Sequence, residues 1–230
     1  MNLYTNDIFL TLLLVLLINI SGYIYSFLFV KNIIGNQSRI QIQSRTNLSY
    51  LNNHVPLVAF NVLTLMLFVF IGLYFFHGYI INNHQISIYK VIIQLFVILL
   101  FDDTFFYFLH RMMHENKFIY KTIHKIHHRA NAPVAIDYLY VHPLEWMSGF
   151  IGPFIGIILL GGVSVYTFWL YLFVRNFHEL AIHSGLKSSF ISRVFPFYGT
   201  NEHHDLHHEK RDGNYASSFT FFDLIFKTKL

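Results

Sequence analysis

Three long apolar runs constrain the fold of this chain more than any other feature of its sequence. They extend from Ile8 to Val30, from Leu57 to Ile81 and from about Ile88 to Leu109. Each is about as long as the roughly 20 residues that a helix needs to cross a bilayer. The composition agrees, because 54% of the 230 residues are hydrophobic and only 12% are charged, whereas an average soluble domain is roughly 25% charged. The sequence therefore predicts an integral membrane protein.

A cleaved signal peptide is the alternative for the first run. Such a peptide has basic residues before its apolar core, a shorter core and small residues at a cleavage site. None of these features is present before or within the run. We therefore expect a retained membrane span.

A helical hairpin is predicted after the third span. The run from Trp146 to about Leu160, the Gly161–Gly162 break and the run from Val163 to about Ile182 form its two arms. The predicted fold class is thus all-α: a membrane helical bundle of three long spans and a hairpin. We expect a single membrane domain over residues 1–230, with N-terminal spans in 1–109, the hairpin in 144–182, and a helical, histidine-rich cap formed by 110–143 and 183–230 (hereafter the cap).

The distribution of charge predicts the orientation in the membrane. With the N-terminus outside, 15 of the 16 Lys and Arg residues fall on the cytoplasmic side or at its edge, and Lys90 is the exception. This agrees with the excess of basic residues in cytoplasmic loops. The same orientation places all 12 histidines from His110 onward on the cytoplasmic side, in a bacterial inner membrane or the endoplasmic reticulum.

The histidines recur at helical spacing. His110 and His114 form H-x3-H, and the spacing H-x2-H-H occurs twice, at 124–128 and at 204–208. Positions three and four apart share a helix face, so we expect each cluster to direct its imidazoles at one point. Neutral imidazole suits iron, copper, nickel and zinc, and the absence of cysteine excludes zinc fingers, iron–sulfur clusters and disulfides.

The number of histidines indicates two metal ions. A single zinc ion needs three or four ligands, and carboxylate-bridged di-iron bundles use Glu-x-x-His pairs, which this chain does not repeat. We predict a polyhistidine site for two ions, most simply two irons. Ten residues are the candidate ligands: His110, His114, His124, His127, His128, His178, His183, His204, His207 and His208.

One pair departs from regular spacing. His178 and His183 are five residues apart, which turns them about 140° from each other on a regular helix. Either the helix loosens at its end, or one of the two is not a ligand.

Carboxylates near the histidines are candidates for orienting them. Asp103 lies inside the third apolar run, where an ionisable group usually faces a bundle interior or a site, and we expect it to accept the outer N–H of a ligating histidine. A solvated helix end is the alternative. Glu202 and Asp205 are further orienting candidates, and a solvated surface is the alternative for both.

Several motifs in order resemble the fatty acid hydroxylase/sterol desaturase superfamily of membrane oxygenases. The resemblance covers roughly residues 100–228 and is carried by these segments: DDTFFYFLHRMMH, IYKTIHKIHH, HPLE, HSG, PFYGTNEHHDLHH and NYASSFTFFDLIFKT. The HSG motif favours His183 over His178 as a ligand, and HSG, PFYG and HHDLHH look closest to the sterol-modifying branch.

The resemblance implies a non-haem di-iron centre that uses O2 to hydroxylate or desaturate a C–H bond of a lipid. It also implies a separate electron donor, a cytochrome b-type protein or a ferredoxin with its reductase. The absence of a nucleotide-binding G-x-G-x-x-G motif from the sequence agrees with a separate electron donor. We expect no nucleic-acid partner. The alternatives are a metal transporter without redox chemistry, a metal-free lipid-binding protein and a zinc hydrolase.

Overall fold

The computed structural model describes residues 3–34, 38–40, 47–76, 78–81, 86–190, 194 and 197–230. Pro196 of the PFYG motif lies outside these residues. The predicted all-α fold class is confirmed. Within the described ranges, strands are limited to β1 (Ile80–Ile81) and β2 (Val163–Ser164), which pair in parallel with Ile80 opposite Val163.

Helices account for the rest of the regular structure. The long helices are α1 (Leu3–Val30), α2 (Leu48–Phe75), α3 (Ile88–Glu115) and α7 (Val165–Ile182). The short ones are α4 (Lys117–Thr122), η1 (His124–Arg129), η2 (Ala135–Leu139), α5 (Pro143–Ser148), α6 (Ile151–Leu159), α9 (Asn201–Lys210) and α10 (Phe221–Ile225).

Among the described residues, three helices are long and apolar enough to cross a membrane. They cover Thr5–Val30, Leu48–Phe75 and Ile88–Glu115, and 28 residues span about 42 Å. Large apolar side chains on them are exposed, for example Leu63 at 67% and Ile93 at 61%. Apolar surface of this extent on helices of this length fits a lipid environment.

Several boundaries differ from the prediction, among them the end of α2, which lies at Phe75 instead of Ile81. Helix α2 begins at Leu48, nine residues before the predicted Leu57, because Asn47 caps it by accepting from Tyr50 N, and Pro56 is accommodated inside the helix. Helix α3 continues six residues beyond Leu109 to Glu115. The last two turns of this helix therefore carry two of the predicted ligands, His110 and His114.

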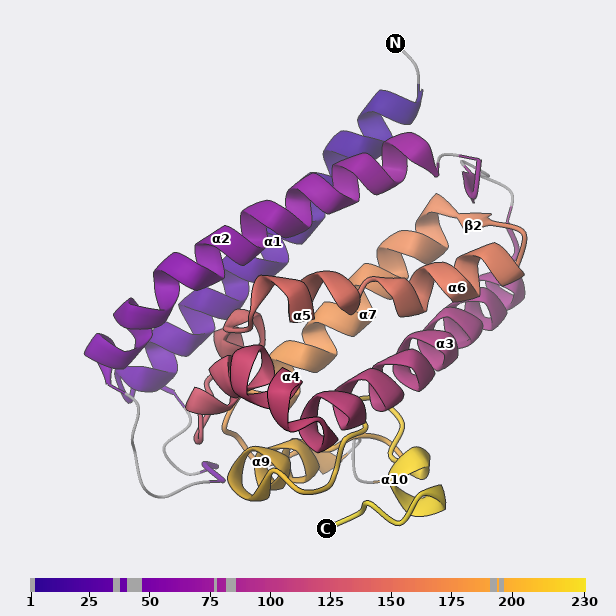
Figure 1. Cartoon of the computed structure of the whole chain (residues 1–230). Coiled ribbons are helices and arrows are strands. Elements are labelled where there is room, and N and C mark those ends of the chain that lie inside the picture. The colour runs from indigo at the N-terminus through magenta and orange to yellow at the C-terminus, as the bar shows by residue number, and fades with distance from the viewer. Residues whose placement is uncertain are drawn as a thin grey trace.

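The helices gather around α7 and end in the cap (Figure 1). Helix α1 contacts both α2 and α7, and α3 contacts both α6 and α7. The N-terminus lies at the end of the bundle opposite to α9 and α10. Buried Asp137 fastens the cap to α2, because it accepts from Tyr50 Oη at 2.8 Å and lies 2.8 Å from His54 Nδ1.

Glycine allows α6 to approach α3 closely. A Cβ atom added at Gly152 would lie 2.8 Å from the Asp102 Cα and 3.0 Å from its carbonyl oxygen. These are backbone atoms of a spanning helix and cannot move aside independently. The contact fixes α6 against the segment of α3 that leads to the histidines.

We expect Gly152→Val to separate α6 from α3 and to destabilise the protein by about 1–3 kcal/mol, as overpacking of a core typically does. Thermal unfolding in detergent, followed by circular dichroism, measures this. Gly72→Ala is the matched control, because its Cβ would meet only Phe154 Cζ at an ordinary 3.4 Å. Equal midpoints for both variants would contradict the account.

Candidate metal centre

Nine of the ten predicted histidines lie in two groups that could each hold a metal ion. In each group the ligand atoms all lie within 4.8 Å of one another. All nine side chains are buried except that of His114, which is half-buried. Group one consists of His110, His114, His124, His128 and His207, and group two consists of His127, His183, His204 and His208.

The imidazole nitrogens of group one converge tightly. The Nε2 atoms of His114, His124 and His128 form a triangle with sides of 2.8, 3.0 and 3.1 Å. His207 Nε2 lies 3.2 Å from His128 Nε2. Two nitrogens each about 2.1 Å from one ion and at right angles lie about 3.0 Å apart. The spacing is that of ligands around a shared ion.

Group two has the same geometry. His204 Nε2 lies 2.9 Å from His183 Nε2 and 3.1 Å from His208 Nε2. His127 Nε2 is 3.4 Å from His183 Nε2. The two groups adjoin, since the ring centroids of His128 and His208 are 4.9 Å apart.

Hydrogen bonds to the outer ring nitrogens fix the tautomer of several of these histidines. Nδ1 of His110 lies 2.7 Å from the Tyr215 carbonyl oxygen, and Nδ1 of His207 lies 2.7 Å from that of Gly213. Nδ1 of His183 lies 2.8 Å from the Glu179 carbonyl oxygen. Because a carbonyl oxygen can only accept, each Nδ1 carries the proton and each Nε2 presents a lone pair.

The convergence of imidazole lone pairs indicates that these residues fit a metal ion. Lone pairs about 3 Å apart repel unless a cation lies between them, and the Nε2 atom of His110 is buried without a hydrogen-bond partner in the described structure. Burial, followed by the neighbouring imidazoles, holds the pKa of His127, His128 and His204 well below the ordinary value. These rings are neutral at pH 7, which is the form that binds metal. The donor set fits two imidazole-liganded transition-metal ions.

One expectation about the histidine clusters was wrong. Each H-x2-H-H copy divides between the groups instead of pointing at one ion: His204 and His208 belong to group two, whereas His207 belongs to group one. On an α-helix, residue i+4 lies about 40° to one side of residue i, and i+3 lies about 60° to the other. In the η1 copy the assignment is reversed: His124 and His128 belong to group one, and His127 belongs to group two.

His178 lies outside both groups. Its Nδ1 is 2.7 Å from Tyr198 Oη. Because helix α7 is regular up to Ile182, the five-residue step turns His178 away from the direction of His183. His183 itself belongs to group two and lies at the C-cap position of α7.

The predicted orienting carboxylates make other contacts. Buried Asp103 accepts the backbone N–H groups of Ser218 and Phe219 at 2.7 and 2.9 Å, and so anchors that loop to α3. Glu202 accepts Ser188 N at 3.0 Å, and Asp205 is buried in α9. The described hydrogen bonds of Asp103 thus reach backbone groups and not the imidazoles.

Sequence reasoning missed two acidic residues that contact the histidines. Glu145 Oε1 accepts from His124 Nδ1 at 2.8 Å, and Glu179 supplies the carbonyl group that accepts from His183. Glu145 lies in HPLE, one of the segments that carry the family resemblance. The glutamate of HPLE was the available signal for the first of them.

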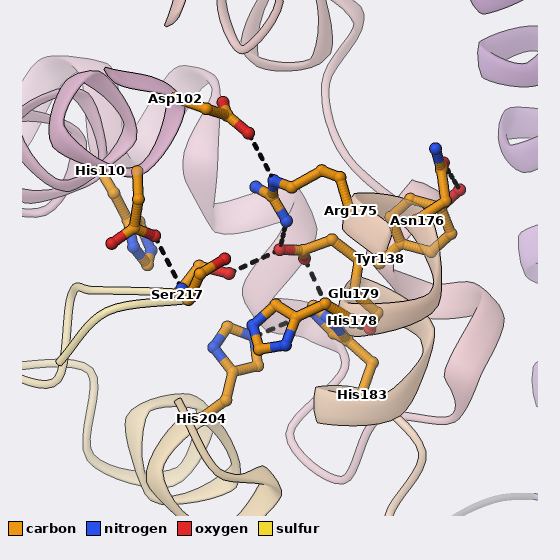
Figure 2. Close-up of polar contacts among 12 residues, drawn as sticks. Asp102, His110, Tyr138, Arg175, Asn176, His178, Glu179, His183, His204 and Ser217 are labelled. Atoms are coloured by element: carbon orange, nitrogen blue, oxygen red, sulfur yellow. Dashed lines mark hydrogen bonds and ion pairs between the residues drawn. The ribbon is translucent and has the colours of Figure 1, made fainter. Parts of the chain in front are cut away.

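A buried ionic network joins the site to the spanning helices (Figure 2). Arg175 donates through Nε to Asp102 Oδ2 at 2.8 Å and through Nη1 to Glu179 Oε1. Ser217 Oγ donates to the same Glu179 oxygen at 2.6 Å. The network connects α3, α7 and the loop before α10 directly beside His183.

A cavity of about 570 Å³ leads from the bundle to both histidine groups. Its walls are mostly apolar and come from α2, α3, α5, α6 and α7. Phe68, Phe150 and Phe168 are among its apolar lining residues, and His124 and His204 are among its polar ones. The volume is within the usual range of small-molecule sites, about 300–1,000 Å³.

Comparisons with known proteins agree with this arrangement. The profile of the fatty acid hydroxylase family matches residues 95–228. The chain is 44% identical to "Methylsterol monooxygenase 1" of Rattus norvegicus over 55% of its own length and 43% of the relative's. It is 35% identical to "Methylsterol monooxygenase erg25B" of Aspergillus fumigatus over 62% of the chain and 50% of that protein.

A relative with another name also matches. The chain is 34% identical to "Very-long-chain aldehyde decarbonylase GL1-10" of Oryza sativa subsp. japonica, over 62% of the chain and 48% of the relative. The chain thus spans about half the length of the curated relatives it matches, and no solved structure matches it. Because the family profile covers more than half of the residues, including the nine clustered histidines, the chain belongs to the fatty acid hydroxylase family.

Proposed function

We propose that this protein is a membrane-bound non-haem di-iron oxygenase that hydroxylates or desaturates a C–H bond of a lipid, with O2 and external electrons. One observation carries the proposal: nine imidazoles in two groups, eight of them buried, adjoin a mostly apolar cavity within a membrane bundle. Two of the relatives described above are named as methylsterol monooxygenases, which supports a methylsterol-like lipid as substrate.

The two histidine groups are the proposed ligands. Five imidazoles of group one and four of group two would hold one iron each, and His178 is not part of our proposed ligand set. Iron bound there supplies the redox chemistry that couples O2 reduction to oxidation of a C–H bond. The electrons come from a separate protein, a cytochrome b-type donor or a ferredoxin with its reductase, on the cytoplasmic side.

The chain itself contributes position and exclusion of water. Glu145 and the carbonyl groups of Glu179, Gly213 and Tyr215 orient the imidazoles through their outer nitrogens. The apolar walls bind the lipid and keep water from the reacting carbon. A lipid reaches this cavity from the bilayer, since its walls include spanning helices α2 and α3.

Lipid profiling by mass spectrometry tests the reaction. Membranes that express the chain are expected to accumulate a lipid about 16 mass units heavier than its precursor for hydroxylation, or about two units lighter for desaturation, only when O2 is present. Product formed equally without O2 would contradict an oxygenase and favour hydrolytic chemistry.

Substitution of one histidine from each group tests the ligands. His127→Ala and His207→Ala are each expected to abolish turnover and to lower bound iron, because each removes a nitrogen from a different group. Both proteins should still insert into membranes, since the spans are unchanged. His142→Asn is the matched control, because His142 lies outside both groups and asparagine can also cap α5. Full activity in both alanine variants would refute the assignment.

Metal exchange tests the choice of iron. The purified protein should contain two irons per chain, because there are two histidine groups. Chelation should abolish turnover, and ferrous iron but not zinc should restore it, because zinc has no redox chemistry. Activity restored by zinc would exclude the proposed mechanism.

A further inference from the structure

One segment of the cap packs along the side of a spanning helix. It consists of α10 and its flanking residues, 219–226, and it lies beside α3 (Figure 1). The Phe219 ring is 6.3 Å from that of Phe96, and the Phe226 ring is 5.4 Å from that of Phe108. Phe96 and Phe108 are 12 residues apart on α3, or about 18 Å. The segment therefore follows a long stretch of an apolar span.

The chain just before α10 reaches the depth of that span. Phe219 N donates to Asp103 Oδ2 at 2.9 Å. Asp103 lies six residues, or about 9 Å, before Leu109, where the apolar run of α3 ends. The hydrocarbon core of a bilayer is about 30 Å thick, or about 20 residues of helix, so the run from Ile88 to Leu109 fills it. The approach to α10 thus lies at or below the level of the lipid headgroups.

Helix α10 presents different faces to the protein and to its surroundings. Asp223 is fully buried and accepts the backbone N–H groups of Tyr215 and Ala216 at 2.9 and 3.1 Å. Leu224 and Ile225 point away from the protein, and Ile225 is 64% exposed. Because exposed apolar side chains beside a lipid-facing helix are typical of membrane contact, this face fits a lipid surface.

Cations lie where the apolar face ends. Lys227 and Lys229 directly follow α10 and are exposed, and the Arg111 guanidinium lies 5.9 Å from the centre of the Phe226 ring. Apolar residues bordered by Lys and Arg are typical of helices that lie in the plane of a bilayer surface, where the cations meet anionic headgroups. An acidic partner protein would explain the cations but not the apolar side chains at the depth of the span.

We infer that α10 is a membrane-surface helix. The side chains of Leu224, Ile225 and Phe226 insert among the acyl chains of the leaflet at the cap end of the bundle. Lys227 and Lys229 contact the anionic headgroups of that leaflet. One part of the cap therefore lies in the bilayer surface instead of in water.

This membrane contact is connected to the histidines. Asp223 of α10 holds the loop whose Tyr215 carbonyl oxygen contacts Nδ1 of His110 in group one. The bilayer thus supports the position of a histidine through α10. The contact itself is independent of the reaction at the metal centre, so failure of the oxygenase proposal would leave it intact.

Spin labelling of the full chain in nanodiscs tests the position of α10. Because the sequence has no cysteine, one introduced cysteine carries the nitroxide without further changes. Ile225→Cys is compared with Ile93→Cys on the exposed side of α3 and with Glu209→Cys on the exposed side of α9. Collisions are measured with O2, which concentrates in hydrocarbon, and with a nickel chelate, which stays in water. The ratio of O2 to nickel collisions at 225 should lie close to that at 93 and several-fold above that at 209.

The lipid composition tests the headgroup contact. Nanodiscs of phosphatidylcholine are compared with nanodiscs that also contain phosphatidylserine. Anionic lipid should raise the ratio at 225, because it draws the two lysines to the surface. Joint Lys227→Gln and Lys229→Gln substitution should remove this rise, whereas Lys210→Gln on α9 should preserve it.

Nickel collisions at 225 as frequent as those at 209 would overturn the inference, because α10 would then lie in water. Infrequent collisions with both reagents would overturn it as well, since protein, such as a second copy of the chain, would then cover the helix. An equal rise with and without the two lysines would reject their contact with headgroups.

Discussion

The proposed metal centre depends on the convergence of nine imidazoles in two groups. The nitrogens of the two groups lie about 3 Å from their neighbours, and carbonyl acceptors hold His110, His183 and His207 in the tautomer that faces inward. Without cations this arrangement is unfavourable. In the proposed centre, metal binding and the folding of the cap would therefore be coupled, because a site of this kind does not exist in the unfolded chain.

Each of two segments contributes histidines to both groups, which makes the two sites interdependent. Each H-x2-H-H copy gives two imidazoles to one group and one to the other, in opposite senses in η1 and α9. In the proposed centre, an ion in either group would therefore hold both η1 and α9. The network of Asp102, Arg175 and Glu179 extends this connection to the spanning helices, so the cavity and the cap form one structure.

Physical reasoning from the sequence located most of this architecture. Apolar length alone identified the three spans, and spacing identified the histidines. Spacing could not divide the histidines into groups, because periodicity states which side chains share a face but not where a second cluster lies. Helix α2 was predicted to start too late because the segment before Leu57 is rich in polar residues, whereas the helix begins at Leu48 and accommodates Pro56. The role of Glu145 depends on a contact 21 residues away in the chain, which no local pattern encodes.

X-ray absorption at the iron edge tests the central claim most directly. On the intact, iron-loaded protein, the account predicts two irons per chain, each surrounded by imidazole nitrogens: up to five at one ion and up to four at the other. The scattering pattern of the imidazole ring should be present and sulfur should be absent, since the chain has no cysteine. A spectrum of iron bound only by water or carboxylate oxygen, or one that lacks the imidazole pattern, would contradict the account.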